Sequence, residues 1–280
     1  MLVIKSGIVV QSIGFQKYLP IGSPAIAIDY LNKWGIDEIA LVNIDSTSKN
    51  HQLNSKQIKS FSKFCQVPLS IGGGIKTVDD IRNVINLGAD KVIINSEAFL
   101  NPKIISEGAK FFGNQCIIVS LDVKKINQKY EVFINSGEVE TNVNIIDQAK
   151  KAEDYGAGEI LINSIDRDGS KTGYDLELIE KVINNVNIPV IACGGVSHPK
   201  HLLEGIKLGV SAVAAANFFH YTEHSVTAIK SYLLKNNANI RLDSYAKYKE
   251  FSFDHLGRVA KKDDDTLDKL RFEYIEQEKI

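Results

Sequence analysis

Two glycine-rich turns carry the residues of this chain that are best suited to binding an anion. The first is Ser70-Ile71-Gly72-Gly73-Gly74-Ile75, and the second, Ile191-Ala192-Cys193-Gly194-Gly195-Val196, follows 121 residues later. Each turn comes after a short apolar run and precedes a helical pattern. Glycine lets the backbone approach an anion closely, and the N–H groups of a helix entrance meet its charge. We therefore expect two phosphate sites, although tight turns that need glycine only for packing would give the same pattern.

The two turns belong to a longer internal repeat. The further matched pairs are residues 88–92 with 209–213, Ser96 with Asn217, and residues 2–5 with 121–124. A period of about 120 residues is far longer than that of solenoid repeats. The repeat predicts a fold made of one half-barrel written twice.

Strands and helices alternate along the chain. Apolar runs predict strands near residues 1–5, 37–43, 67–71, 90–95, 116–122, 158–163, 188–192 and 212–216. Helical patterns are expected near residues 24–34, 55–65, 77–87, 101–112, 143–155, 175–185, 198–208 and 225–234. The strands are continuous apolar runs, as a sheet buried on both faces requires. We therefore predict an α/β fold of the (β/α)8 TIM-barrel class, in one domain over residues 1–242.

Three segments depart from this alternation. Residues 6–23 are expected to form a long polar loop and residues 124–137 a small hairpin. Both follow a strand and would lie at the C-terminal face of the barrel, where active sites are built. Residues 243–280 are expected to form a charged, partly helical C-terminal extension. The side chains of its apolar stripe, which would dock on the barrel or alternatively on a partner, are Leu267, Leu270, Phe272 and Tyr274.

The composition excludes several classes of protein. The 280 residues carry a formal net charge of −1, so no general attraction to nucleic acid or to an anionic membrane is expected. No apolar run approaches the roughly 18 residues of a membrane span, and no signal-peptide pattern is present. We therefore expect a cytoplasmic protein. Cys65, Cys116 and Cys193 are widely spaced and the histidines are scattered, which favours buried thiols and predicts neither a metal site nor a cofactor.

Three charged residues stand at the starts of alternate predicted strands. Glu38, Lys91 and Glu159 begin the second, fourth and sixth strands. Alternate strands of a barrel contribute to the same interior layer, so these side chains are expected to meet at the N-terminal end of the barrel. Charges in such a layer need partners or water. A salt-bridge cluster without any transport role is the simplest alternative.

Three motifs resemble the cyclase subunit of imidazole-glycerol-phosphate synthase, HisF. They are ADKVIINS at residues 89–96, GAGEIL at residues 156–161 and, above all, SIDRDGSKTGYD at residues 164–175. The resemblance covers residues 1–242. It implies a barrel that receives ammonia from a partner glutaminase and uses it on a doubly phosphorylated substrate at the top of the barrel.

The resemblance and the repeat together assign the candidate site residues. One phosphate site would be formed by Gly73, Gly74, Asn95 and Ser96, and the other by Asp168, Gly169, Gly194, Gly195, Ala216 and Asn217. By resemblance, Glu38, Lys91 and Glu159 form the charged ring through which ammonia enters, and Asp90 faces the glutaminase. Asp122, at the end of the fifth strand, matches a catalytic aspartate that acts as general acid or base. A purely structural hydrogen-bond acceptor is the alternative for Asp122.

The second catalytic aspartate of the resembled cyclase has no counterpart here. The family pattern Leu-Asp-Val-Lys and the internal repeat both align it with Val3, and valine neither accepts nor donates a proton. The change predicts impaired cyclisation. It favours the HisF-like paralogues of bacterial surface-polysaccharide pathways, in which a HisH-like glutaminase and the barrel feed ammonia to a sugar amidotransferase that forms an acetamidino sugar. The alternatives are an active cyclase of histidine biosynthesis and a catalytically silent scaffold that activates the glutaminase.

Overall fold

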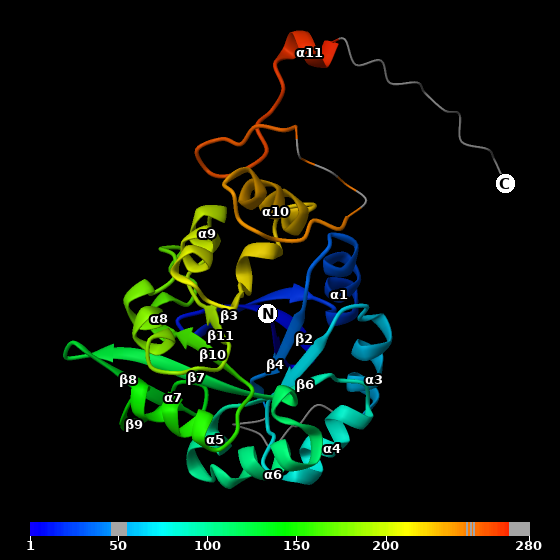
Figure 1. Cartoon of the computed structure of the whole chain (residues 1–280). Coiled ribbons are helices and arrows are strands. Elements are labelled where there is room, and N and C mark those ends of the chain that lie inside the picture. Colours follow the sequence, from blue (N-terminus) through cyan, green and yellow to red (C-terminus); the bar gives the residue numbers. More distant parts are fainter. Residues whose placement is uncertain (46–54, 245, 247, 249, 269–280) are drawn as a thin grey trace, which may run out of the picture.

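A ring of parallel strands forms the centre of the molecule (Figure 1). The computed structural model describes residues 1–45, 55–244, 246, 248 and 250–268. The barrel strands are β1 (Leu2–Lys5), β4 (Ile39–Asn43), β5 (Leu69–Gly72), β6 (Lys91–Ile94), β7 (Ile117–Ile126), β10 (Glu159–Ser164), β11 (Val190–Cys193) and β12 (Ala212–Val213). Each pairs in parallel with the next along the chain. The fold is the predicted α/β barrel of the (β/α)8 class.

Helices follow the barrel strands and cover the outside of the sheet (Figure 1). They are α1 (Pro24–Lys33), α3 (Ser55–Phe64), α4 (Val78–Asn86), α5 (Ser96–Leu100), α6 (Lys103–Phe112), α7 (Ile145–Asp154), α8 (Leu176–Ile183), α9 (Pro199–Leu208) and α10 (Ser225–Lys235). The helix predicted over residues 101–112 is instead two helices, α5 and α6, because Asn101 leaves the helical conformation before Pro102. The last barrel strand is shorter than predicted and ends at Val213.

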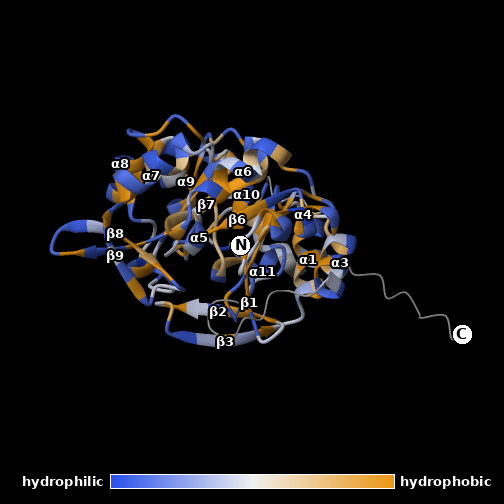
Figure 2. Cartoon of the chain, turned by 90° about the horizontal axis from the view of Figure 1, so that it is seen from below, coloured by the Kyte–Doolittle hydropathy of each residue, from blue (hydrophilic) through white to orange (hydrophobic). Residues whose placement is uncertain are grey.

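Apolar side chains fill two separate regions of the barrel. The larger cluster lies between the sheet and the helices. The smaller one, inside the ring of strands, consists of Ile93, Ile118, Leu161 and Cys193, with partly buried neighbours such as Val42. Seen from below, the barrel strands are mostly hydrophobic in colour, whereas the outer helix surfaces carry most of the hydrophilic colour (Figure 2). None of the helices in the described part of the chain is long and apolar enough to cross a membrane.

The prediction of a loop over residues 6–23 is wrong, because this segment forms two strands. β2 (Ile8–Ile13) pairs antiparallel with β1, and β3 (Lys17–Gly22) pairs antiparallel with β2. Gly14, in a left-handed conformation (φ 59°), lies in the turn between them. The polar residues that suggested a loop are spread over the turns and both strands, whereas Val9 and Val10 are buried. We call β2 and β3 together the N-terminal hairpin.

The hairpin predicted over residues 124–137 is confirmed and is larger than expected. β7 continues to Ile126 and pairs antiparallel with β8 (Lys129–Ile134), which pairs with β9 (Val139–Asn144). Each half of the barrel therefore begins with a parallel strand that turns back into two antiparallel ones. The internal repeat thus extends into both segments that depart from the bare barrel pattern.

The first part of the C-terminal extension packs on the barrel. The Phe253 and Tyr232 rings lie 5.5 Å apart, and the Tyr248 hydroxyl lies 2.7 Å from Nδ1 of His224, at the start of α10. The short helix α11 (Asp264–Asp268) includes Leu267 of the predicted stripe, whereas Leu270, Phe272 and Tyr274 lie outside the described residues. The domain boundary at residue 242 stays a prediction.

Candidate functional site

A cavity of about 310 Å³ lies at the C-terminal ends of the barrel strands. Its lining includes the ends of five strands or the residues just after them, and both hairpins reach it. The polar lining residues are Ser12, Tyr18, Asn43, Lys76, Asn95, Ser96, Glu97, Ser120, Asp122, Asn135, Ser136, Asn163 and Asp168. A volume of this size is at the low end for small-molecule pockets.

Asp122 is the buried carboxylate of this cavity, with only 7% of its surface exposed. It sits in β7, where its register partner is Asn163 of β10. Nδ2 of Asn95 donates to Oδ2 of Asp122 at 3.1 Å, and Asn163 also forms a hydrogen bond with the carboxylate. Burial raises the pKa of Asp122 to about 7; the two amide bonds oppose this shift and the charge of Asp168 adds to it. A carboxyl group with this pKa can exchange a proton near neutral pH.

The hydrogen bond from Asn95 is expected to lower the pKa of Asp122. In Asn95→Ala the carboxylate loses a donor that favours its charged form, so the pKa of Asp122 should rise further above its present value of about 7. The carboxyl carbon of Asp122, followed by NMR across a pH titration, measures this. Asn43→Ala, in the lining of the same cavity, should leave the titration close to that of the wild type. An unchanged or lowered pKa in Asn95→Ala would contradict the role of this amide.

Val3 occupies in the first half-barrel the place that Asp122 has in the second. Val3 pairs with Val42 of the next barrel strand and with Val10 of the N-terminal hairpin. Asp122 likewise pairs with Asn163 and with Phe133 of the second hairpin. Both Val3 and Asp122 line the cavity, so one of the two equivalent positions offers a carboxylate and the other an isopropyl group.

The predicted phosphate residues of the first half-barrel come together at the cavity. Gly73 and Gly74 follow β5 in left-handed conformations (φ 111° and 73°) that only glycine adopts at low cost. They line the cavity together with Asn95 and Ser96, which follow β6. The Ser96 hydroxyl donates to Oδ1 of Asn95 at 3.2 Å. We call Gly73, Gly74, Asn95 and Ser96 the first cradle.

The predicted phosphate residues of the second half-barrel are arranged differently. We call Asp168, Gly169, Gly194, Gly195, Ala216 and Asn217 the second cradle, and of these the cavity lining includes only Asp168. Oδ2 of Asp168 accepts hydrogen bonds from the Ser12 hydroxyl at 2.6 Å and the Phe15 N–H at 3.1 Å. Burial, opposed by these bonds, raises the pKa of Asp168. The side chain of Asp168 thus holds the N-terminal hairpin.

The three predicted charges meet at the opposite end of the barrel. Nζ of Lys91 lies 2.6 Å from Oε1 of Glu159 and 3.2 Å from Oε2 of Glu38. Burial alone would lower the pKa of Lys91, but the hydrogen bonds and charges of the two glutamates outweigh it and raise this pKa. The cavity lining does not include these three residues, and the apolar layer of Ile118, Leu161 and Cys193 belongs to the barrel interior.

Asp90 is exposed beside this cluster. Its backbone N–H donates to the Leu69 carbonyl, and its carboxylate accepts from the Leu69 N–H, each at 2.8 Å. The predicted contact of Asp90 with a partner stays a prediction. Among the residues that the structure describes, no three His, Cys, Asp or Glu side chains gather as metal ligands would.

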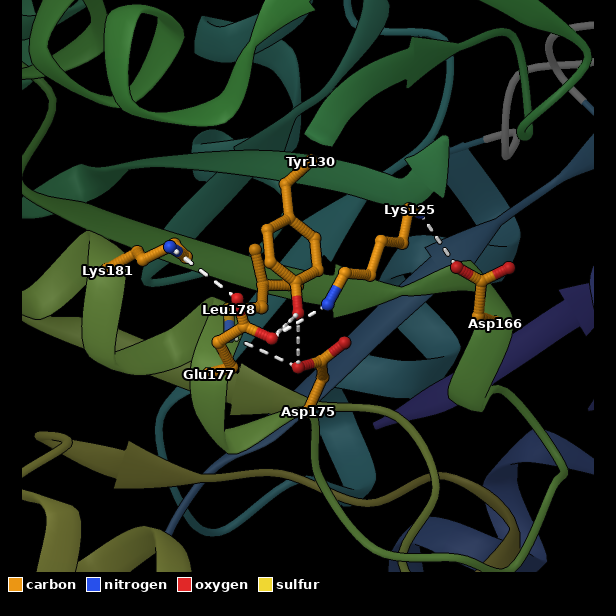
Figure 3. A network of polar contacts seen from close by, with 7 residues as sticks. All are labelled: Lys125, Tyr130, Asp166, Asp175, Glu177, Leu178 and Lys181. Carbon is orange, nitrogen blue, oxygen red and sulfur yellow. Dashed lines mark hydrogen bonds and ion pairs between the residues drawn. The ribbon is translucent and has the colours of Figure 1, made fainter. Parts of the chain in front are cut away.

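A polar network fastens the strand that carries Asp122 (Figure 3). The Tyr130 hydroxyl in β8 lies 2.9 Å from Oδ1 of Asp175, which also caps the start of α8. Nζ of Lys125 pairs with Glu177 at 2.7 Å, and the Lys125 N–H donates to Asp166 at 2.8 Å. These contacts tie the outer part of the β7–β8 hairpin to the segment between β10 and α8 and to the first turn of α8.

Sequence reasoning missed several cavity residues. Tyr18 lies in a segment expected to be loop; burial, with added effects of nearby carboxylates, raises its pKa to about 12, and Nζ of Lys5 lies 3.9 Å from its ring centre. Ser12 was also missed, because it lies in the same segment that was expected to be a loop. Asn43 and Asn163 were detectable, since Asn43 is the last residue of β4 and Asn163 the last but one of β10, where side chains reach the C-terminal face of the barrel.

Known proteins of similar sequence give the family. A model of the histidine biosynthesis protein family matches residues 2–225. The chain is 45% identical over 259 residues to "Putative imidazole glycerol phosphate synthase subunit hisF2" of Vibrio vulnificus (strain YJ016), covering 92% of this chain and 95% of that protein. It is 41% identical to "Imidazole glycerol phosphate synthase subunit HisF" of Bacillus cereus (strain G9842) over 241 residues, and of Clostridium botulinum (strain Langeland / NCTC 10281 / Type F) over 239 residues. These alignments cover 85% and 84% of this chain, and 96% and 94% of the relatives. The chain therefore belongs to the histidine biosynthesis protein family, as a HisF-like member.

Proposed function

We propose that this chain is the HisF-like barrel subunit of a glutamine-dependent amidotransferase system. It receives ammonia from a HisH-like glutaminase at the end where Lys91 pairs with Glu38 and Glu159, and passes it toward the cavity that holds Asp122. One observation carries the proposal: the charged cluster and Asp122 are both in place, while Val3 fills the position equivalent to Asp122. A cyclisation that needs two carboxylates in opposed roles lacks one of them.

The apolar layer between the two ends suits this role. Ammonia is neutral and passes among side chains such as Ile118 and Leu161 at low cost, whereas ammonium would lose its hydration. The cluster of one ammonium group and two carboxylates does not repel a cation, so the cost for ammonium arises in the apolar layer beyond it. Ammonia is about the size of water, so small transient movements of these side chains would let it pass without a permanently open channel.

The proposed acceptor is an acetamido sugar on a separate amidotransferase. In the net reaction a C–N bond forms between ammonia and the acetamido carbon, the C–O bond breaks, and the oxygen leaves as water with two hydrogens of ammonia, so that an acetamidino group forms. The relative with 45% identity is designated hisF2 and those with 41% are designated HisF, so kinship alone supports the histidine pathway equally. The change at Val3 is what favours the sugar.

An active cyclase of histidine biosynthesis is the second candidate, and one observation favours it. Asp168 lies in the lining of the same cavity and acts electrostatically on Asp122. It would be the second carboxylate in place of the one missing at Val3. Its hydrogen bonds with Ser12 and Phe15 hold it in a fixed position, which suits a structural group better than one that must exchange a proton.

Reconstitution with a HisH-like glutaminase tests the proposal. The two proteins should co-purify as an assembly whose mass is the sum of its parts, and glutamine hydrolysis should increase on mixing. With ¹⁵N-amide glutamine and a sugar amidotransferase, label should reach the acetamidino group more efficiently than from free ammonium. Failure to associate would overturn the proposal. Output unchanged by Asp122→Asn would favour the silent scaffold instead.

A further inference from the structure

We infer that Lys230 of α10 is a positioning residue for the ammonia entrance, because its ion pair with Asp37 holds the loop that carries Glu38. This role rests on the proposed function, since it matters only where ammonia enters beside Lys91. The loop connects α1 to β4 and spans residues 34–38; we call it the Glu38 loop. The sequence motifs singled out above include neither Lys230 nor Asp37.

Glu38 is the member of the charged cluster that its surroundings hold least. Oε2 of Glu38 lies 3.2 Å from Nζ of Lys91, whereas Oε1 of Glu159 lies 2.6 Å from the same atom. The Glu38 side chain is 51% exposed, against 17% for Glu159. Glu159 is the first residue of β10, whereas Glu38 precedes β4. The geometry of the entrance therefore depends on what holds the Glu38 loop.

Side chains alternate across β4, and this alternation places Asp37 and Glu38 on opposite sides of the barrel wall. Ile39 belongs to the cluster between the sheet and the helices, and Ala40 packs against the cluster inside the ring of strands. The same alternation, followed back along the chain, puts Glu38 on the inside, where it meets Lys91, and Asp37 on the outside. A contact that fixes Asp37 from the helix side therefore fixes the backbone from which Glu38 reaches inward.

Lys230 supplies that contact from α10. Nζ of Lys230 lies 2.7 Å from Oδ2 of Asp37, and only 7% of the Lys230 side chain is exposed. Within the described chain this nitrogen makes no hydrogen bond of normal geometry, so the charge of Asp37 is what offsets its loss of water. The pair is therefore a firm attachment, because a buried ammonium group costs free energy when its carboxylate moves away. Arg241, which is 60% exposed and lies 3.4 Å from Asp37, is held less firmly.

Three further contacts hold the other end of the Glu38 loop. The buried Thr227 hydroxyl of α10 donates to the Trp34 carbonyl at 2.9 Å. Oγ of Ser244, in the C-terminal extension, lies 3.0 Å from the same hydroxyl. Gly35 has a left-handed backbone (φ 77°), and a Cβ atom built on it would overlap the Asp243 carbonyl oxygen. The loop is thus enclosed by α10 and the start of the C-terminal extension.

Loss of the ion pair should release Glu38 without unfolding the barrel. In Lys230→Met the buried stem is replaced by an apolar side chain of similar length. Asp37, which is 56% exposed, keeps water and Arg241 as partners. A displaced Glu38 leaves the entrance open on one side, so part of the ammonia should reach bulk water before it enters the barrel.

Reconstitution of the full chain with the glutaminase and the sugar amidotransferase gives the first readout. It measures the share of ¹⁵N from the glutamine amide that reaches the acetamidino group and the share that is released to bulk water. In Lys230→Met we expect the transferred share to fall severalfold, while glutamine hydrolysis stays close to that of the wild type. Asp37→Asn removes the same pair from its exposed side and should give the same loss.

NMR titration of the Lys91 side chain, followed at its Cε carbon in the chain alone, gives the second readout. The charge of Glu38 contributes to the raised pKa of Lys91, so this pKa should fall in Lys230→Met. A general loss of stability would not produce this fall. Lys33→Met is the matched control, since Lys33 pairs with Asp29 on α1, just before the Glu38 loop, and both side chains are about half exposed. It should leave both readouts as in the wild type.

Both readouts must change for Lys230 to have this role. If either stays at the wild-type value in Lys230→Met, or if Lys33→Met changes them equally, Lys230 is an ordinary structural residue of α10 and the inference is overturned. If the wild-type complex transfers no label, the proposed function fails, and the Lys91 titration then decides by itself whether Lys230 positions the cluster.

Discussion

Replacing Asp122 by asparagine is expected to stabilise the fold above pH 7 by about 2–4 kcal/mol. The pKa of Asp122 is about 7 in the folded chain against an ordinary value of 3.8, so the folded state keeps this proton to higher pH than the unfolded state does. The fold therefore loses stability as the pH rises from about 4 through about 7, because ionisation inside the cavity opposes folding. The gap corresponds to at most about 4 kcal/mol.

Urea unfolding at pH 4.5 and pH 8 measures this effect. At pH 4.5 the carboxyl group is protonated in the folded chain but mostly ionised in the unfolded one, so the variant should exceed the wild type in stability by only about 1 kcal/mol; the difference should be largest at pH 8. Asp79→Asn is a matched control, since the Asp79 side chain is 85% exposed and should give less than about 0.5 kcal/mol at either pH. A destabilised Asp122→Asn at pH 8 would mean that the carboxylate contributes to folding rather than to chemistry.

Replacing Lys91 by methionine is expected to destabilise the fold by about 1–3 kcal/mol. The change leaves Glu38 and Glu159 without the cation that lies between them, and breaking a buried ion pair costs about 3–5 kcal/mol. We reduce that figure because the Glu38 side chain is about half exposed. Glutamine hydrolysis in the complex should continue while labelled nitrogen is lost to bulk water.

Denaturant unfolding of the wild type and of Lys91→Met measures the difference in their free energies of unfolding. Lys181→Met is the matched control, because Lys181 pairs with Glu177 at 3.5 Å and both side chains are about half exposed, whereas Lys91 is mostly buried. It should cost no more than about 0.5 kcal/mol. If Lys91→Met were equally mild and nitrogen transfer stayed intact, the cluster would be an ordinary rim salt bridge.

Local sequence patterns predicted the parts of this molecule that depend on local chemistry. Continuous apolar runs gave the barrel strands, and paired glycines gave the turns after β5 and β11, where left-handed backbone requires them. The charges at strand starts were expected to share a layer, and Lys91 does contact both glutamates. In each case the signal lies within a few residues or in the regular geometry of a barrel.

Contacts between distant segments were beyond such patterns. The N-terminal hairpin was missed because polar residues interrupt the apolar pattern of β2 and β3, and three of the six residues of β3 are exposed. Its position on the barrel depends on hydrogen bonds of Ser12 with Asn217 and Asp168, which are 205 and 156 residues away in the sequence. The elevated pKa of Asp122 likewise depends on burial by several elements. The internal repeat did hold one unused signal, since a hairpin after the fifth strand implies another after the first.

Ring closure is the activity that separates the two leading functions most directly. The full chain should be mixed with the doubly phosphorylated ribulosyl substrate and an ammonium salt, beside the Bacillus cereus HisF relative as the positive control. With Val3 at the position equivalent to Asp122, we expect turnover at least about a hundredfold below the control, the smallest usual loss for a missing general acid or base. Turnover at the rate of the control would contradict delivery of ammonia to a sugar amidotransferase and would assign the chain to histidine biosynthesis.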